Sequence, residues 1–248
     1  MHRDMLYIGG SWTESQGEGR ISVENPATGD IIGSVPEGTL EDADTAVLAA
    51  REAFEGWSNS PIEERIRVLN SLSESFKTRT NELAELITKE VGTPIEYSKM
   101  AMVGTPRVVT RSYAKLLESY KWEEEIRNST IVREPVGVCA FITPWNFPLH
   151  QIIGKVAPAI AAGCTMVLKP SKEAPLNAFI LAEMLDEIGL PKGVFNLVSG
   201  YGSTVGSHLA SHPEVDMVSF TGSTAAGVRV SQAAAESVKR VTLELGGK

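Results

Sequence analysis

The sequence predicts an α/β fold: a doubly wound, mostly parallel sheet with an N-terminal helical layer and a protruding β-hairpin. Three observations lead to this prediction. Apolar strand-like segments alternate with helical segments from residue 136 onward. Helical periodicity dominates the first 119 residues, and a polar turn between two strand-like segments separates the two parts. Strands that are apolar throughout and alternate with helices are typical of a parallel sheet covered on both faces.

Residues 1–119 are predicted to form short strands and a helical layer that packs on the rest of the chain. A short strand and a turn are expected at residues 7–12 and a strand at 31–35, with a turn-rich segment at 23–30 between them. Thr39 is the predicted N-cap of a first helix whose apolar stripe ends at Trp57. The next helix is expected to begin near Pro61, and a further helical segment ends at Gly92. Another helix is expected over residues 95–118.

Residues 120–135 are predicted to form the hairpin, and residues 136–248 form the βαβ part. Strands are expected at 136–142, 165–169, 194–198, 217–220 and 240–243. Helices are expected at 151–162, 176–188, 203–210 and 224–237. Because doubly wound sheets bind ligands beyond the carboxyl ends of their strands, residues directly after these strands are the candidates for function.

Composition excludes several classes of function. The formal net charge of −8 and the pI of about 5.2 argue against a nucleic-acid partner, which favours a basic surface. The longest apolar stretch, residues 156–168, is interrupted by Pro158 and Gly163 and is too short to span a bilayer, so no membrane partner is expected. The N-terminus has no apolar signal region, which predicts a cytoplasmic protein.

The cysteines and histidines predict neither a nucleophile nor a metal site. A lone intracellular cysteine can act as a nucleophile, but Cys139 and Cys164 both lie in apolar segments and are interpreted as small buried hydrophobes. Neither has a nearby cation or helix start that would lower its thiol pKa. No metal is expected, because the chain offers only isolated histidines and a pair without a third ligand nearby: His2, His150, His208 and His212.

Polar and glycine-rich residues fall at the predicted strand ends, and this coincidence indicates a nucleotide site. They are Thr143–Asn146, Lys169–Lys172, Gly200–Gly206, Thr221–Ser223 and Glu244. The segment with Gly202 and Gly206 lacks the spacing of a dinucleotide fingerprint, and a tight turn explains it equally well. Ser223 offers a hydroxyl and N–H groups at a helix start, which suit a pyrophosphate; a simple N-cap is the alternative.

Asn146 and Glu244 are the candidate catalytic side chains. An amide held in the proline-flanked loop around Asn146 is suited to stabilising an oxyanion, although it could instead hold the turn or cap the next helix. Glu244 follows an apolar strand, where a carboxylate has an adjustable pKa and can act as a general base; bonding to a backbone N–H is its alternative role.

Four blocks in this order resemble the cofactor-binding half of the aldehyde dehydrogenase superfamily. They are Thr143-Pro144-Trp145-Asn146-Phe147-Pro148, Lys169-Pro170-Ser171, Phe220-Thr221-Gly222-Ser223-Thr224 and Leu243-Glu244-Leu245-Gly246-Gly247-Lys248. The resemblance implies a Rossmann-like domain that binds NAD or NADP. It also implies cofactor contacts from Ile142, Thr143, Pro144, Trp145, Asn146, Lys169, Ser171, Lys172, Gly202, Gly206, Phe220, Thr221, Gly222, Ser223, Glu244, Leu245 and Gly246.

The resemblance also implies the reaction. A cysteine thiolate attacks a small-molecule aldehyde with help from Asn146, the resulting thiohemiacetal is oxidised to a thioester, and water activated by Glu244 releases the carboxylic acid. The family's cysteine follows the last block, so these 248 residues are expected to be an incomplete, inactive piece without the catalytic domain. A non-catalytic nucleotide-binding or partner-capping module is the alternative. The family's hairpin packs between subunits, which implies a homo-oligomer when the protein is full length; a solvated surface hairpin is the alternative.

Lys172 departs from the pattern of strict NAD users. Many of them carry a ribose-binding glutamate three residues after the lysine that matches Lys169. A carboxylate there repels a 2′-phosphate, whereas a lysine attracts it. We therefore expect dual or NADP-leaning cofactor use.

Overall fold

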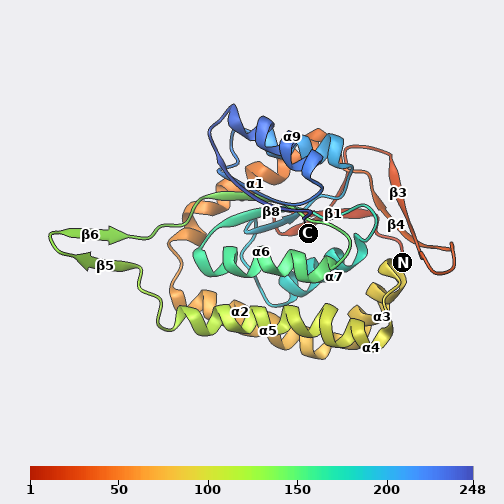
Figure 1. The fold of residues 1–248 in the computed structure, drawn as a ribbon, viewed down its shortest axis with the longest axis horizontal. Coiled ribbons are helices and arrows are strands. Elements are labelled where there is room, and N and C mark those ends of the chain that lie inside the picture. The colour runs from red at the N-terminus through yellow and green to blue at the C-terminus, as the bar shows by residue number, and fades with distance from the viewer. Residues whose placement is uncertain (248) are drawn as a thin grey trace.

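A seven-stranded sheet forms the centre of the computed structural model, which describes residues 1–247 (Figure 1). The strand order is β11–β10–β7–β8–β9–β1–β2. Strands β7 to β11 run parallel to one another, while β1 is antiparallel to both of its neighbours, β9 and β2. Their bounds are β1 Met5–Ile8, β2 Ser11–Glu14, β7 Val138–Ile142, β8 Thr165–Lys169, β9 Phe195–Leu197, β10 Met217–Gly222 and β11 Arg240–Leu245. The predicted doubly wound, mostly parallel sheet is confirmed.

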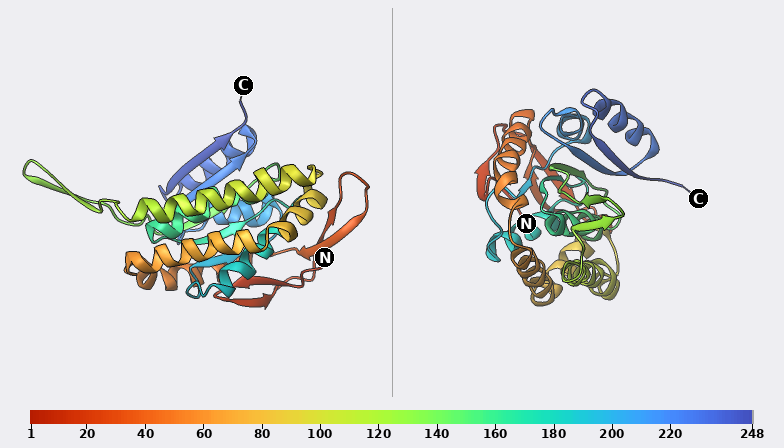
Figure 2. Two further views of the ribbon diagram at one scale, coloured as in Figure 1. Left: turned by 90° about the horizontal axis from the view of Figure 1, so that it is seen from below. Right: turned by 90° about the vertical axis from the view of Figure 1, so that its left-hand side faces the viewer.

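Helices cover the two faces of the sheet and divide the apolar core into two clusters (Figures 1 and 2). Along β7, Cys139 and Phe141 enter one cluster, while Ala140 and Ile142 enter the other, as the alternation of side chains in a strand requires. The first face carries α2 (Ile62–Thr78), α5 (Gly104–Leu117), α6 (Pro148–Ala162) and α7 (Leu176–Glu187), and the second carries α1 (Leu40–Ser58), α8 (Ser207–Ser211) and α9 (Thr224–Ala235).

The N-terminal helices begin and end where their capping residues predict. Thr39 caps α1 by accepting from the Asp42 N–H, and the Asp42 carboxylate accepts from the Thr39 N–H in return. Helix α3 (Thr80–Val91) ends at Gly92, which is left-handed with φ 82°. The helix expected over 95–118 consists of α4 (Ile95–Tyr97), a π-helical segment η1 (Ser98–Val103) and α5.

The strand expected at 31–35 is confirmed as β4 (Ile31–Pro36), but its partner β3 (Arg20–Glu24) in the turn-rich N-terminal region was missed. Strand β3 pairs with β4 and buries Ile21 and Val23 on one side. Only two apolar residues alternate in β3, which is too short a pattern to distinguish a strand from the turn that follows it.

The predicted hairpin projects from the body of the molecule, at the left of Figure 1. Strand β5 (Glu123–Ile126) pairs with β6 (Ser129–Val132), and Arg127 in the turn has φ 59°. Most of its side chains are exposed. Its role between subunits remains a prediction. Among residues 1–247, no helix has both the length and the apolar character that crossing a membrane requires.

Candidate functional site

The sheet changes its winding direction between β7 and β10. From β7 the chain adds β8 and then β9 on one side, and afterwards crosses back to place β10 and β11 on the other side. Connections that leave two adjacent parallel strands in opposite directions open a crevice at the carboxyl ends of those strands. The fold therefore provides a ligand site between β7 and β10.

A cavity of about 400 Å³ lies at this point. Four of the predicted cofactor residues line it: Ile142 and Phe220 from the ends of β7 and β10, and Gly202 and Gly206 from the π-helical segment η2 (Gly202–Gly206). The remaining lining residues come from η2, α8 and α9: Ser203, Ser207, Ala210, Ala226, Arg229, Val230 and Ala233. Residues from three separate segments of the sequence thus meet in one apolar cavity.

Lys169 lies beside this cavity at the end of β8. Its side chain approaches Gly206, since a Cβ at that glycine would lie 3.8 Å from the Lys169 Cδ. The Lys169 Nζ donates to the Pro170 carbonyl at 2.9 Å. The residue is only 4% exposed, and burial, together with Lys172, lowers the pKa of the Lys169 ammonium to about 8. An ammonium has three donors, so two remain for a ligand hydroxyl.

Unpartnered hydroxyls lie at the ends of β7 and β10. The Oγ1 atoms of Thr143 and Thr221 are buried and have no hydrogen-bond partner within residues 1–247. Buried polar groups normally have partners, so these two oxygens fit a polar ligand at the strand ends. Ser223 uses its hydroxyl as the N-cap of α9, accepting from the Ala226 N–H at 3.3 Å, which is the simpler of its two predicted roles.

The loop from Thr143 to Phe147 carries the candidate oxyanion donor. Asn146 is exposed, and its Oδ1 accepts from the Phe147 N–H at 3.0 Å. This bond orients the amide and leaves its NH₂ group available to donate. Pro144 is partly buried and Trp145 is 53% exposed, so the loop presents an open aromatic surface.

Two further predicted residues follow β8. The Ser171 Oγ accepts from the Glu173 N–H at 3.3 Å. The Lys172 Nζ forms an ion pair with the Glu173 Oε1 at 2.6 Å and lies 6.0 Å from the centre of the Tyr201 ring. The hydrogen bond with Glu173 raises the pKa of Lys172. Glu173 therefore partly neutralises the charge expected to attract a 2′-phosphate.

Glu244 lies on β11, opposite Thr221 of β10, and lines a second cavity of about 420 Å³ rather than the first. Lys155 of α6 lines the same cavity and donates to the Ser219 Oγ at 3.0 Å. Burial lowers the pKa of Lys155, and the charge of Glu244 opposes that effect. Glu244 therefore has a cationic neighbour within its own cavity.

The last predicted residues continue β11. Leu245 packs on α9, since a Cβ at Gly227 would lie 2.6 Å from the Leu245 Cδ2. Gly222 is similarly crowded, because a Cβ there would meet the Phe220 ring at 2.5 Å. Gly246 is exposed beyond the strand.

The sequence interpretation missed Arg229 and Lys155. Arg229 follows a glycine-rich helix start on α9 and gave no signal of its own. Lys155 did leave a signal, because it is the only Lys, Arg, Asp or Glu in the apolar segment from Pro148 to Ala162. A single charge on an otherwise apolar helix indicates a buried site for that charge.

The predicted burial of both cysteines is confirmed, but the expectation that neither has a nearby cation was wrong for Cys164. Both are buried and line the cavity of Glu244. The neighbouring Cys139 side chain lowers the pKa of the Cys164 thiol, and backbone N–H groups and the Arg65 guanidinium act in the same direction. Cys164 and burial raise the pKa of Cys139. The cation comes from α2, about a hundred residues away in the sequence, and so no local pattern reveals it.

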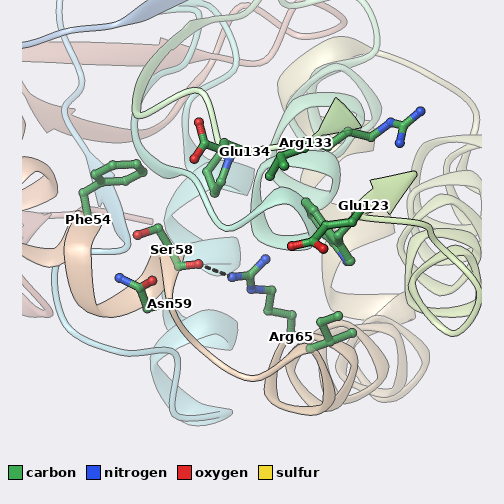
Figure 3. A pocket seen from close by; sticks show the side chains of 11 residues that line it. Phe54, Ser58, Asn59, Arg65, Glu123, Arg133 and Glu134 are labelled. Carbon is green, nitrogen blue, oxygen red and sulfur yellow. Dashed lines mark hydrogen bonds between the residues drawn. The ribbon is translucent and has the colours of Figure 1, made fainter. Parts of the chain in front are cut away.

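Arg65 also lines a third cavity, of about 500 Å³, at the base of the hairpin (Figure 3). Its guanidinium donates to the Ser58 carbonyl at 2.6 Å and lies 5.7 Å from the centre of the Trp122 ring. None of the predicted site residues lines this cavity. It is therefore separate from the candidate site at the strand ends.

Comparison with known proteins identifies the family. The profile of the aldehyde dehydrogenase family matches residues 12–248. The chain belongs to the aldehyde dehydrogenase family. It is 51% identical over 246 residues to a 3-succinoylsemialdehyde-pyridine dehydrogenase of a Pseudomonas species, covering 98% of this chain and 51% of that protein.

Solved aldehyde dehydrogenases share the fold closely. Aldehyde dehydrogenase C of Pseudomonas syringae, solved with NAD⁺ and octanal, matches with a TM-score of 0.98 and 47% identity over 100% of this chain and 52% of that one. Betaine aldehyde dehydrogenase of Staphylococcus aureus, solved with NAD⁺, matches with a TM-score of 0.95 and 40% identity over 99% and 50% of the two chains. The chain thus spans about half the length of the relatives that it matches.

Proposed function

We propose that this chain supplies the NAD(P)⁺ site and two catalytic side chains of an enzyme that oxidises a small-molecule aldehyde to a carboxylic acid. The observation that supports this most is the cavity at the point where the sheet reverses its winding, lined by strand-end residues of separate motifs. Membership of the aldehyde dehydrogenase family and relatives solved with NAD⁺ agree with it.

In this proposal the cofactor is bound by the residues around the first cavity. The two free donors of the Lys169 ammonium bind ribose hydroxyls, and Thr143 and Thr221 supply the buried oxygens that lack a partner. Ile142 and Phe220 form the apolar wall. When bound, the cofactor accepts the hydride of the oxidation.

Asn146 and Glu244 act on the substrate side. The Asn146 NH₂ group donates to the oxygen that gains negative charge when the aldehyde carbon is attacked. Glu244 removes a proton from the water that releases the acid, and Lys155 places a positive charge in the same cavity. The attacking thiolate belongs to a cysteine other than Cys139 and Cys164, since both are buried in the apolar core.

We propose that NAD⁺ binds at least as well as NADP⁺. Lys172 by itself favours the phosphate of NADP⁺, but its ion pair with Glu173 places a carboxylate beside it. Replacing Glu173 with glutamine should then shift preference toward NADP⁺ by several-fold, and replacing Lys172 with glutamine should shift it toward NAD⁺. If both variants changed the preference between NAD⁺ and NADP⁺ in the same direction, the opposing roles given to Lys172 and Glu173 would be wrong.

Isothermal titration calorimetry of the chain with NAD⁺ and with NADP⁺ tests the proposed site. Wild-type chain should bind one dinucleotide, and Phe220→Trp, which fills the first cavity, should abolish binding. Glu244 lies outside that cavity, so the Glu244→Gln variant should still bind the dinucleotide. Absence of binding in the wild type would refute the cofactor role of this chain. Binding without aldehyde turnover in the longest natural form of the protein would favour the nucleotide-binding module instead.

The full-length protein is further proposed to form a homo-oligomer through the hairpin. Ile126, Ile131 and Val132 are 48%, 40% and 55% exposed on this projecting element, which is the kind of apolar surface that a second subunit covers. Light scattering of a variant with Ile131→Asp should report a smaller assembly than the wild type. The cytoplasmic location stays a prediction from the sequence.

A further inference from the structure

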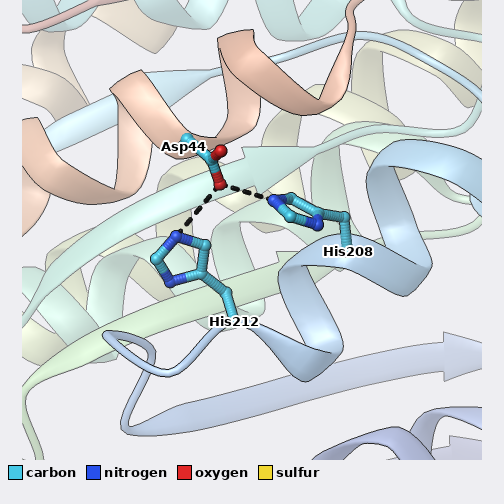
Figure 4. A group of neighbouring side chains, drawn as sticks. All are labelled: Asp44, His208 and His212. Atoms are coloured by element: carbon cyan, nitrogen blue, oxygen red, sulfur yellow. Dashed lines mark hydrogen bonds and ion pairs between the residues drawn. The ribbon is translucent and has the colours of Figure 1, made fainter.

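Three metal-ligating side chains from distant parts of the chain converge between α1 and α8 (Figure 4). The Nε2 atoms of His208 and His212 lie 2.5 and 3.2 Å from the same oxygen, the Oδ1 of Asp44. The sequence predicted no third ligand for the histidine pair, and this was wrong, because Asp44 comes from a helix more than 160 residues earlier. We propose that these three residues bind a divalent transition-metal ion of the Zn²⁺ class.

The spacing of the three ligand atoms suits such an ion. Zn²⁺ binds nitrogen and oxygen at about 2.0–2.2 Å, so the ligands of a tetrahedral site lie roughly 3.3 Å apart. The His212–Asp44 distance of 3.2 Å is already that of a tetrahedral edge. The His208–Asp44 distance of 2.5 Å is shorter than this edge, so the two side chains must separate to admit an ion. All three ligand atoms lie within 4.8 Å of one another, so side-chain rotations can bring them around one ion.

The chemistry of the ligands selects the class of metal. Two imidazoles and one carboxylate favour Zn²⁺, Co²⁺ or Ni²⁺ over Mg²⁺ and Ca²⁺, which prefer oxygen ligands. His212 is 9% exposed, whereas His208 and Asp44 are 27% and 47% exposed. The site is therefore closed on the His212 side and open at Asp44, where water can complete the coordination.

A backbone hydrogen bond limits how His212 can bind an ion. The His212 Nδ1 accepts from the Glu214 N–H at 3.1 Å, so the ring proton lies on Nε2. A metal that binds Nε2 must move this proton and displace that bond. We therefore expect micromolar rather than nanomolar affinity.

The site is separate from the dinucleotide cavity but shares a helix with it. Helix α8 turns Ser207 and Ala210 toward that cavity and His208 toward Asp44. An ion bound between α1 and α8 would fix the position of α8, which lines the dinucleotide cavity. Without metal, the same side chains form a carboxylate that accepts hydrogen bonds from two imidazoles, which is the structural alternative that the experiment must exclude.

Calorimetric titration of the 248-residue chain with Zn²⁺, after treatment with EDTA, tests the proposal. One ion per chain should bind, and Mg²⁺ should not compete. His208→Gln and Asp44→Asn should each weaken Zn²⁺ binding at least about tenfold. The amide oxygen that Asp44→Asn introduces can still accept both imidazole hydrogen bonds, so this variant separates metal binding from the structural contact.

His2→Gln is the matched control, because it removes a histidine outside the cluster and leaves the α1–α8 contact intact. It should bind Zn²⁺ as the wild type does. The absorption spectrum of Co²⁺ should show tetrahedral bands in the wild type and in His2→Gln only. Urea unfolding in EDTA verifies that each variant folds; His208 is partly exposed, so its glutamine variant is expected to fold.

The proposal would be overturned if the wild type bound no Zn²⁺, or if His208→Gln and Asp44→Asn bound Zn²⁺ as tightly as the wild type does.

Discussion

Replacing Lys169 with methionine is expected to stabilise the chain while weakening dinucleotide binding. The ammonium is buried at the end of β8 with one acceptor, the Pro170 carbonyl. Burial lowers its pKa from 10.5 to about 8. Since each pKa unit corresponds to about 1.4 kcal/mol, holding this charge costs the folded state about 3 kcal/mol at neutral pH. Methionine keeps most of the packing, so we expect a gain of about 1–3 kcal/mol in the free energy of unfolding.

The pH dependence of this gain follows from the sign of the pKa change. Below about pH 8 both the folded and the unfolded chain hold the Lys169 proton, and the cost of burial is complete. Between about pH 8 and 10.5 the folded chain releases the proton while the unfolded chain keeps it, so the wild type gains stability as the pH rises. The advantage of Lys169→Met should therefore shrink over this range.

Urea unfolding of the two proteins without cofactor, at neutral pH and near pH 10, measures this difference. Lys172→Met is the control, because Lys172 is exposed and should change stability by less than about 0.5 kcal/mol. Calorimetry should show NAD⁺ binding weakened roughly tenfold or more in Lys169→Met, as expected for a lost hydrogen bond from a charged donor. A Lys169→Met chain that is less stable than the wild type, or an advantage that is the same at both pH values, would refute the burial argument.

The remaining predictions concern two glycines and the cysteine pair. Gly137→Ala should lower the free energy of unfolding by about 3 kcal/mol or more in urea, because φ is 126° and the new Cβ would lie 1.9 Å from the Asp216 Oδ2. A Cβ at Gly206 would meet only ordinary contacts at 3.8 Å, so Gly206→Ala should change the free energy of unfolding by less than about 1 kcal/mol. The same variant should bind NAD⁺ measurably more weakly, because Gly206 lines the cavity at the ends of β7 and β10. Unchanged NAD⁺ affinity would argue against that cavity as the binding site. Cys164 should react with a small alkylating reagent before Cys139, because its thiol pKa is lowered while that of Cys139 is raised, as mass spectrometry of labelled peptides would reveal. Faster labelling of Cys139 would contradict the direction of their pKa changes.

Much of the candidate site could be predicted because its residues follow strands. Ile142, Lys169 and Phe220 each end an apolar strand, and parallel strands bring their carboxyl ends to one edge of the sheet. The sequence did not predict that Glu244 lines a different cavity from these residues. Side chains alternate between the two faces of a strand, so the cavity that a residue lines depends on the pairing of β11 with β10.

The sequence by itself determined the alternation of strands and helices, the caps at Thr39 and Gly92, and the family, because all of these depend on residues close together in the chain. Only the tertiary structure decided which distant groups meet. It placed Arg65 beside Cys164, Lys155 in the cavity of Glu244, and a carboxylate of α1 against two histidines at α8. The physical reason is that burial and charge depend on neighbours in space, and those neighbours come from helices and strands that are far apart in the sequence but pack on the same face of the sheet.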